Sequence, residues 1–364
     1  MVFNIFIAVI SIISLLVIHE LGHFLIAKRF GVKVEEFGIG YPPRLFGKKF
    51  GETLYSINLL PFGALVKIPG TDGDDSAVEE SRRYTGKPAW QKALILIGGI
   101  VSCWIVAVIL LSIVFAMGAP QSISDEQAGP LVNPQVQILG VAPDSPAQAA
   151  GLRAGDTIKG FRIGDSELGV NKVKDVQDLT AQYRGQEITL TIQRGKEVFT
   201  ASLTPRVSPP EGEGAMGLAL VRTALVSYPW WSAPVKGIEA TVNLTSDIVV
   251  GLGSTLGSLI QGKGLPQGAQ LLGPIGLGTL ITQAAQVGIN YFLQFIAIIA
   301  VYLSVFNFLP IPALDGGKLL FLAIEKIRGK VMPRKIEEGI TTAFFGLLIL
   351  LMVFITFKDI TRLF

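Results

Sequence analysis

The two histidines of the chain lie in one pentapeptide, His19-Glu20-Leu21-Gly22-His23. Because an α-helix makes one turn every ~3.6 residues, positions four apart share a face, so both imidazoles can bind one metal ion. Glu20 then lies beside any water that reaches the metal. The pattern H-E-x-x-H on a helix is typical of zinc metalloproteases, in which the glutamate is the general base. The pentapeptide therefore predicts a hydrolytic zinc centre with His19 and His23 as ligands and Glu20 as the base.

This pentapeptide lies within an apolar run, residues 3–26, which is long enough to cross a lipid bilayer. An ionisable side chain at bilayer depth costs about 2.5 kcal/mol or more, so such side chains normally mark functional sites. The alternative is a chance match on the surface of a soluble helix. That alternative leaves three ionisable residues in an apolar run without partners, whereas a bound metal offsets their cost. We therefore favour a metal site.

A catalytic zinc site needs a third protein ligand, because three ligands leave the fourth position open for water. The chain has no other histidine, so this ligand is an aspartate, a glutamate or a cysteine. Asp315 borders an apolar span in an unusual local sequence, between two helix-breaking prolines and two glycines that permit close backbone approach. We expect Asp315 to join the two histidines. The alternative is an aspartate that caps a helix beside a loop.

The composition indicates a membrane protein with a soluble part. Half of the 364 residues are hydrophobic, the mean hydropathy is +0.52, and only 16% are charged, against about 25% in soluble domains. A net charge of +3 is too small to suggest nucleic-acid binding. A single cysteine, Cys103, excludes an intramolecular disulfide. Four runs approach the ~20 apolar residues of a membrane span: residues 3–27, 93–117, 287–309 and 340–357.

The basic residues predict the orientation of these spans. Eleven of the 31 Lys and Arg residues lie between the first two spans, and six more lie between the last two. The positive-inside rule places both of these loops in the cytoplasm. Both termini and the long segment between the second and third spans are then extracytoplasmic. The histidine turn and Asp315 both fall toward the cytoplasmic side, so geometry allows them to meet.

The chain is predicted to be a multi-pass α-helical membrane protein with four transmembrane helices, a membrane-associated β-hairpin and an inserted α+β domain. In chain order the segments are a first span with the histidines (1–30), a cytoplasmic loop with the hairpin (31–92), a second span (93–117), a soluble domain (128–206), an amphipathic or interfacial segment (207–286), a third span with Asp315 (287–317), a cytoplasmic loop (318–339) and a fourth span (340–357).

Local patterns predict several elements within these segments. The first loop contains three strand-like stretches, residues 34–39, 53–57 and 64–68. In the soluble domain, Ser145 reads as the N-cap of a short helix over 147–150, and Asp175 as the cap of a second helix over 176–183. Two strands follow, at 188–193 and 198–204, and a long amphipathic stretch covers 234–260.

Over nearly its whole length the chain resembles the site-2 protease family of intramembrane zinc metalloproteases, in particular the bacterial group with a PDZ domain between the second and third spans. The residues that carry the resemblance are the histidine pentapeptide, the stretch 307–317 that matches N-x-x-P-x-P-x-L-D-G-G, the hairpin stretch 61–67, the Gly-Pro-Ile-Gly stretch at 273–276 and the PDZ-like stretch 149–156. The chain departs from the family in its second span, where Gly98-Gly99-Ile100-Val101-Ser102 replaces G-P-x-x-N.

The resemblance implies one zinc ion per chain, with His19, His23 and Asp315 as ligands and Glu20 as base. It also implies that substrate lies extended along the hairpin. The implied substrate-binding residues are Asn307, Gly63, Ala64, Leu65 and Val66.

The substrates implied are single-span membrane proteins of the bacterial inner membrane, cleaved within or near their spans in regulated intramembrane proteolysis. Examples are membrane-tethered transcription regulators, anti-sigma factors and signal-peptide remnants. The PDZ-like domain would offer a groove for a peptide C-terminus between residues 136–141 and 176–183. It could instead act as a size filter or a spacer. Two other functions stay open: a membrane metal transporter or sensor, and a catalytically inactive PDZ-bearing binding module.

Overall fold

The computed structural model describes residues 2–70, 78–126, 132–163, 166–195, 197–210, 212–264 and 272–361. Among these residues, four helices are long and apolar enough to cross a membrane. They are α1 (Val2–Arg29), α2 (Ala89–Met117), α7 (Ile289–Phe308) and α9 (Arg334–Thr361). The four predicted spans are therefore confirmed as helices, each with bounds close to those that the apolar runs predict.

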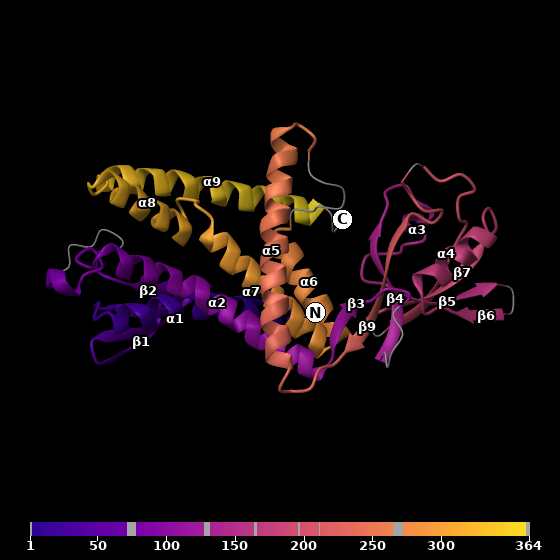
Figure 1. Cartoon of the computed structure of the whole chain (residues 1–364), viewed down its shortest axis with the longest axis horizontal. Coiled ribbons are helices and arrows are strands. Elements are labelled where there is room, and N and C mark those ends of the chain that lie inside the picture. Colours follow the sequence, from indigo (N-terminus) through magenta and orange to yellow (C-terminus); the bar gives the residue numbers. More distant parts are fainter. Residues whose placement is uncertain are drawn as a thin grey trace. The chain divides into compact units, whose positions relative to one another are not determined.

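The chain forms two compact units. The helical unit comprises Met1–Ser112, Pro234–Thr282 and Phe295–Phe364, and the β-rich unit comprises Ile113–Ala233 and Gln283–Gln294. In Figure 1 the helical unit contains α1, α2, α8 (Asp315–Arg328), α9 and the hairpin, together with the long helix α5 (Ala233–Ile260). The β-rich unit contains the large sheet.

Helices α1 and α2 pack closely at two glycines. A Cβ added at Gly22 would lie 2.2 Å from the carbonyl oxygen of Gly98, and one at Gly98 would lie 2.7 Å from that of Gly22. The Ser102 hydroxyl lies within hydrogen-bond distance of the carbonyl oxygens of Ile18 (2.9 Å) and Gly99 (2.7 Å), which share its single proton. Small and hydroxyl residues are what membrane helices use to approach one another. The Gly-Gly-x-x-Ser stretch thus joins α2 to the turn of α1 that carries the histidines.

The loop after α1 folds as the predicted hairpin, with strands β1 (Glu36–Phe50) and β2 (Thr53–Lys67). Both strands bend, so the hairpin has four rows. Residues 36–39 pair with 54–57 on one side and with 64–67 on the other, while residues 44–50 pair with 53–58. The outer rows are therefore 44–50 and 64–67, and residues 44–50 and 64–66 form ladder pairs on one side only among the described residues.

The hairpin packs against the end of α1. The hairpin residues Phe37 and Val66 pack against a buried apolar cluster at the end of α1. The buried members of this cluster are Phe24, Ala27, Val32, Val34, Ile68 and Ile95. The rings of Phe24 and Phe37 meet edge to face, with centroids 5.3 Å apart. This packing holds the hairpin directly beside the turn of α1 that carries the histidines, because Phe24 follows His23 in the chain.

Helix α8 (Asp315–Arg328) begins at the predicted third ligand. A Cβ at Gly316 would lie 2.1 Å from the carbonyl oxygen of Leu309, and one at Gly317 would lie 2.2 Å from that of Ile311. Only glycine fits at these two positions, so they let α8 turn back tightly against the end of α7. Helix α6 (Pro274–Val287) begins at the Gly-Pro-Ile-Gly stretch. There the Asp359 carboxylate of α9 accepts a hydrogen bond from the Gly276 amide at 2.8 Å.

The β-rich unit is built on a seven-stranded sheet with the order β3-β9-β4-β5-β7-β8, and β6 pairs with β5. The strands are β3 (Ala119–Ser122), β4 (Val132–Val141), β5 (Thr157–Ile163), β6 (Ser166–Gly169), β7 (Ile188–Arg194), β8 (Glu197–Leu203) and β9 (Leu218–Val226). The predicted strands β7 and β8 are confirmed. β9 was not predicted, and it joins the sheet from residues assigned to the amphipathic segment.

The helices α3 (Pro146–Ala149) and α4 (Val173–Gln182) contribute Ala147 and Val176 to the apolar core of this sheet. Ser145 caps α3 as predicted, since its hydroxyl accepts from the Gln148 amide. The predicted start of α4 was wrong. Lys172 is its N-cap, and Asp175 lies one turn inside, where its carboxylate accepts from the Lys172 amide at 3.0 Å. The Asp175 carboxylate reaches back to the amide of the N-cap residue, as the third residue of a helix does in a capping box. An aspartate in this role is easily taken for the N-cap itself when only the sequence is known.

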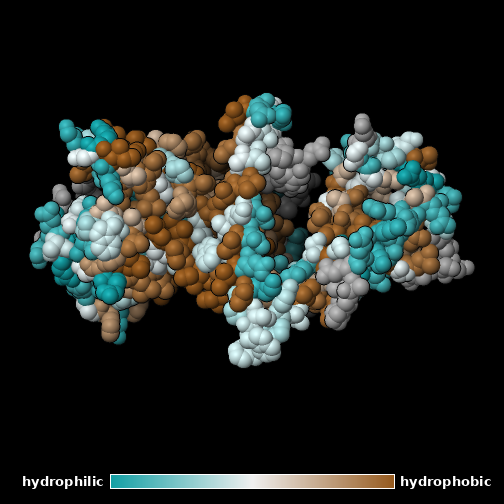
Figure 2. Space-filling model, viewed as in Figure 1, coloured by the Kyte–Doolittle hydropathy of each residue, from teal (hydrophilic) through white to brown (hydrophobic). Residues whose placement is uncertain are grey.

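The helices expose large apolar side chains over wide areas. Figure 2 shows hydrophobic surface gathered over the long helices. On α9, Phe345, Leu350, Phe354 and Phe357 are each more than half exposed. Monomeric soluble proteins rarely expose continuous apolar surface of this extent, whereas lipid-facing helices do. The chain is a multi-pass helical membrane protein with additional β-structure.

Candidate metal centre

His19, His23 and Asp315 meet in the helical unit. The Asp315 Oδ2 atom lies 3.0 Å from His19 Nε2 and 3.1 Å from His23 Nε2, and the two Nε2 atoms are 3.2 Å apart. All three donor atoms lie within 4.8 Å of one another. Zn–N bonds of about 2.0–2.1 Å place the donors of a tetrahedral site roughly 3.3 Å apart. Two imidazoles and a carboxylate at these separations fit a zinc ion.

Two elements far apart in the sequence supply these donors. The histidines lie one helical turn apart on α1, and their rings stand at 87° to each other. Asp315 is the first residue of α8, but it does not cap that helix. The N-cap is Leu314, and no side chain forms a cap hydrogen bond there. The Asp315 carboxylate instead faces the imidazoles, so the helix-capping alternative does not describe its contacts.

The orientation of His23 is held by the backbone of α2. Its Nδ1 atom lies 2.8 Å from the carbonyl oxygen of Ile95. A carbonyl only accepts, so Nδ1 carries the proton and Nε2 keeps its lone pair toward the other two donors. Metal-binding histidines usually have such a partner, which fixes the tautomer and the ring orientation.

Gly99 of α2 lies directly against the donor atoms. A Cβ added there would lie 2.3 Å from His23 Nε2 and 2.9 Å from His19 Cε1. Gly99 occupies the position where the family pattern has proline. The departure from the family pattern is visible in the sequence, but nothing in the local sequence shows that Gly99 is the residue of α2 that faces the histidines.

We therefore expect Gly99→Ala to displace the imidazoles and to weaken zinc binding by about 10–100-fold, the range seen when the support of a ligand is lost. Zinc affinity of the purified full-length protein, measured by competition with a chelator, tests this. Gly278→Ala is the matched control, because a Cβ at that helical glycine meets no heavy atom within 4 Å. Equal zinc affinity in the Gly99 variant and the wild type would contradict the expectation.

Glu20 lies between the two histidines on α1 and is partly buried. It is not a member of the donor cluster, which leaves its carboxylate available as a base. In the hairpin, burial and then the negative charge of Glu20 raise the pKa of the Tyr41 phenol. The Tyr41 ring in turn packs against Gly63, where a Cβ would lie 2.9 Å from Tyr41 Cε2.

The predicted substrate-binding residues lie at two places. Gly63 adopts φ +123° and leads into the outer hairpin row, in which Ala64 is 4% exposed. Leu65 and Val66 continue that row. Asn307 lies near the end of α7, and its amide donates to the carbonyl of Leu303 at 2.9 Å.

The comparison with known proteins decides the family. The family model described as Peptidase family M50 matches residues 7–351. The chain belongs to peptidase family M50. A Clostridium perfringens protein assigned as a zinc metalloprotease is 34% identical over 357 residues, which cover 97% of each chain. The zinc metalloprotease RasP of Geobacillus kaustophilus is 28% identical, with 97% of this chain and 98% of that protein covered.

A third relative is the regulator of sigma-W protease RasP of Bacillus subtilis, which is 28% identical with 99% of each chain covered. This M50 peptidase is a zinc metalloprotease, so the family, the enzyme class and the zinc cofactor expected from the sequence are confirmed. The donor cluster of His19, His23 and Asp315 is consistent with one zinc site.

Proposed function

We propose that this M50 peptidase hydrolyses peptide bonds within or near the spans of membrane-anchored proteins, with His19, His23 and Asp315 as zinc ligands and Glu20 as general base. The observation that carries the proposal is the meeting of Asp315, at the start of α8, with the two histidines that flank Glu20 on α1, a helix long and apolar enough to span a membrane. It also explains why an apolar span contains three ionisable residues, since each then has a role.

When bound, zinc supplies a Lewis acid that polarises a carbonyl and lowers the pKa of water to about 7. Glu20 accepts a proton from the attacking water at its carboxylate and delivers it to the leaving amine. The Ile95 carbonyl accepts the proton of His23 Nδ1 in a hydrogen bond, so that Nε2 stays unprotonated and can bind zinc. The partly buried position of Glu20 restricts competing solvent around the reacting groups.

Substrate is proposed to bind as an extended strand on the hairpin. A peptide bond inside a helix is shielded and already hydrogen-bonded, so the substrate must unwind before it is cleaved. Among the described residues, 64–66 form ladder pairs on one side only, and a strand edge of this kind can accept a further strand by main-chain hydrogen bonds. This row follows Gly63, where an added Cβ would lie 2.9 Å from the Tyr41 ring.

Cross-linking tests this binding mode. We expect a cysteine at Leu65 to form a disulfide with a cysteine near the cleavage site of a single-span substrate, in a Glu20→Gln background that prevents cleavage. Cys103 is fully buried and does not compete. Lys48→Cys is the matched control, because it lies on the opposite outer row of the same hairpin. Equal adduct yields at the two positions would refute substrate pairing at row 64–67.

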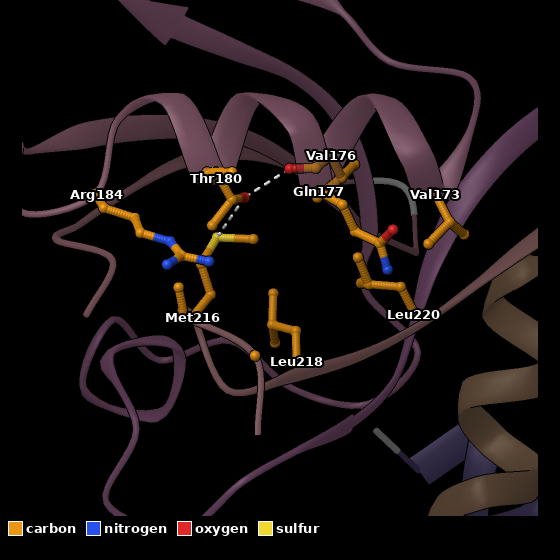
Figure 3. Close-up of a pocket in the computed structure, with 11 residues that line it drawn as sticks. Val173, Val176, Gln177, Thr180, Arg184, Met216, Leu218 and Leu220 are labelled. Atoms are coloured by element: carbon orange, nitrogen blue, oxygen red, sulfur yellow. Dashed lines mark hydrogen bonds between the residues drawn. The ribbon is translucent and has the colours of Figure 1, made fainter. Parts of the chain in front are cut away.

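We further propose that the β-rich unit acts as a PDZ domain that captures a peptide C-terminus. A pocket of about 210 Å³ lies between α4 and residues 214–220 (Figure 3). The sequence predicted a peptide groove between residues 136–141 of β4 and the helix at 176–183. The strand that lines the pocket beside α4 is instead β9. The physical reason is that β9 pairs with β4 along residues 218–225 and places β4 one strand farther away.

The chemistry of the pocket suits an apolar peptide end. Its floor and walls are formed mainly by Val173, Val176, Met216, Leu218 and Leu220, and Arg184 lies at one end (Figure 3). Residues 218–221 of β9 pair only with β4 among the described residues, since β3 covers 223–226. A peptide strand added at this edge would bring its terminal carboxylate toward a guanidinium. A filter that selects substrates by the size of their outer part is the alternative use of this unit.

The proposed location is the bacterial inner membrane, with both termini and the β-rich unit outside and the metal centre toward the cytoplasm. The distribution of Lys and Arg supports this orientation. The name of the Bacillus subtilis relative, regulator of sigma-W protease, supports a membrane-anchored regulator of a sigma factor as the substrate class. The partners are then such single-span proteins and the lipid bilayer.

A further inference from the structure

The two histidines differ in what holds the ring nitrogen that faces away from the donor cluster. For His23 the partner is the backbone carbonyl of Ile95, at 2.8 Å. For His19 the Nδ1 atom lies 3.7 Å from the Sγ atom of Cys103 on α2. That sulfur also lies 3.9 Å from the carbonyl oxygen of Leu15. Cys103 is fully buried.

These contacts form a complete chain of hydrogen bonds. When His19 Nε2 keeps its lone pair toward the donor cluster, Nδ1 carries the proton and donates to the Cys103 sulfur. The thiol proton is then free to donate to the Leu15 carbonyl. A thiol is a weak donor and a weak acceptor, so it can fill both roles at once. An apolar side chain at this position would leave the buried Nδ1–H without a partner, which is costly.

The placement of Cys103 on α2 supports this reading. Ile95, Gly99 and Cys103 are spaced by four residues, so they lie along one face of the helix. Ile95 contacts His23, Gly99 lies against both imidazoles, and Cys103 contacts His19. One face of α2 therefore supports both rings, and Cys103 is the member that acts through its side chain.

We propose that Cys103 is a positioning residue of the metal centre, which fixes the tautomer and ring orientation of His19 through an Nδ1–H to sulfur hydrogen bond. The proposal rests on the proposed role of His19 as a zinc ligand. Outer partners of metal-binding histidines typically change metal affinity by about 10–100-fold. The thiol of Cys103 is thus a functional group of the zinc site and not only a small buried side chain.

The test uses the full-length protein in detergent, with zinc affinity measured by chelator competition and the ligand field measured from the absorption bands of bound Co²⁺. We expect Cys103→Ala to bind zinc about 10–100-fold more weakly and to shift the Co²⁺ bands. Cys103→Ser keeps a group that can donate and accept, so it should recover most of the lost affinity. Where the alanine variant does not fold, Cys103→Val removes the same hydrogen bonds at similar volume.

Leu111→Ala is the control for cavity formation, because Leu111 is buried on α2 two turns beyond Cys103. It should lower the melting temperature and leave zinc affinity unchanged. Wild-type affinity and Co²⁺ bands in Cys103→Ala, or in Cys103→Val, would overturn the proposal, as would an equal loss in the serine and alanine variants. His19→Ala distinguishes the ligand role of His19 from the positioning role of Cys103. If His19→Ala bound zinc with wild-type affinity, the ligand role would be overturned. If His19→Ala lost zinc affinity while Cys103→Ala kept it, only the positioning role would be overturned.

Discussion

Replacing Glu20 by glutamine is expected to leave zinc bound and to lower the cleavage rate of a single-span substrate by about 10²–10⁴-fold, the usual contribution of a general base. Glutamine has nearly the same size and shape, but its amide cannot accept the proton that the carboxylate takes. Glu20 is not among the clustered donor atoms, so zinc content should stay at one per chain. Cleavage by the reconstituted protein and metal analysis of the same sample measure the two quantities.

Glu239→Gln is the control for this experiment, since Glu239 is an exposed carboxylate on α5 that pairs with Lys236. It should cleave at the wild-type rate. Undiminished cleavage by Glu20→Gln would remove Glu20 from its proposed role. Loss of both zinc and cleavage would indicate that Glu20 supports the metal instead of the proton transfer.

The membrane helices and the histidine turn could be predicted because their signals are local. Apolar runs of sufficient length gave α1, α2, α7 and α9 within a few residues of their observed ends. The face shared by His19 and His23 follows from helical periodicity alone. Asp315 was reached by elimination, because a catalytic zinc site needs a third ligand and the unusual local sequence pointed to the start of α8.

The features that were missed depend on contacts between distant segments. The Ile95 carbonyl supports His23 through its backbone, so the identity of the residue gives no signal. β9 is short and follows a stretch rich in proline and glycine, and its role appears only when it pairs with β4. The pocket beside α4 was assigned to the wrong strand for the same reason. The departure at Gly99 was visible in the sequence, and the missing information was the helix face that meets α1.

Asp315→Ala is expected to have the largest effect on metal content. Asp315 supplies the one anionic donor of the cluster, and its Oδ2 atom lies 3.0 and 3.1 Å from the two Nε2 atoms. Removal leaves two neutral imidazoles, too few ligands for a catalytic zinc site. Zinc affinity should fall by more than about 100-fold, beyond the range typical of outer partners, and cleavage should fall with it. Chelator competition and cleavage of the same reconstituted substrate measure both effects.

Asp359→Ala separates ligation from the general cost of removing a buried carboxylate. Asp359 is 4% exposed in the helical unit. It accepts a hydrogen bond from the Gly276 amide at the start of α6, which is the helix-capping role that was the alternative for Asp315. Its loss leaves a helix terminus without this partner and should cost about 0.5–2 kcal/mol of stability, with zinc affinity unchanged. If Asp315→Ala instead behaved like Asp359→Ala, with lower stability and full zinc occupancy, Asp315 would be a structural residue and the third ligand would have to be sought elsewhere.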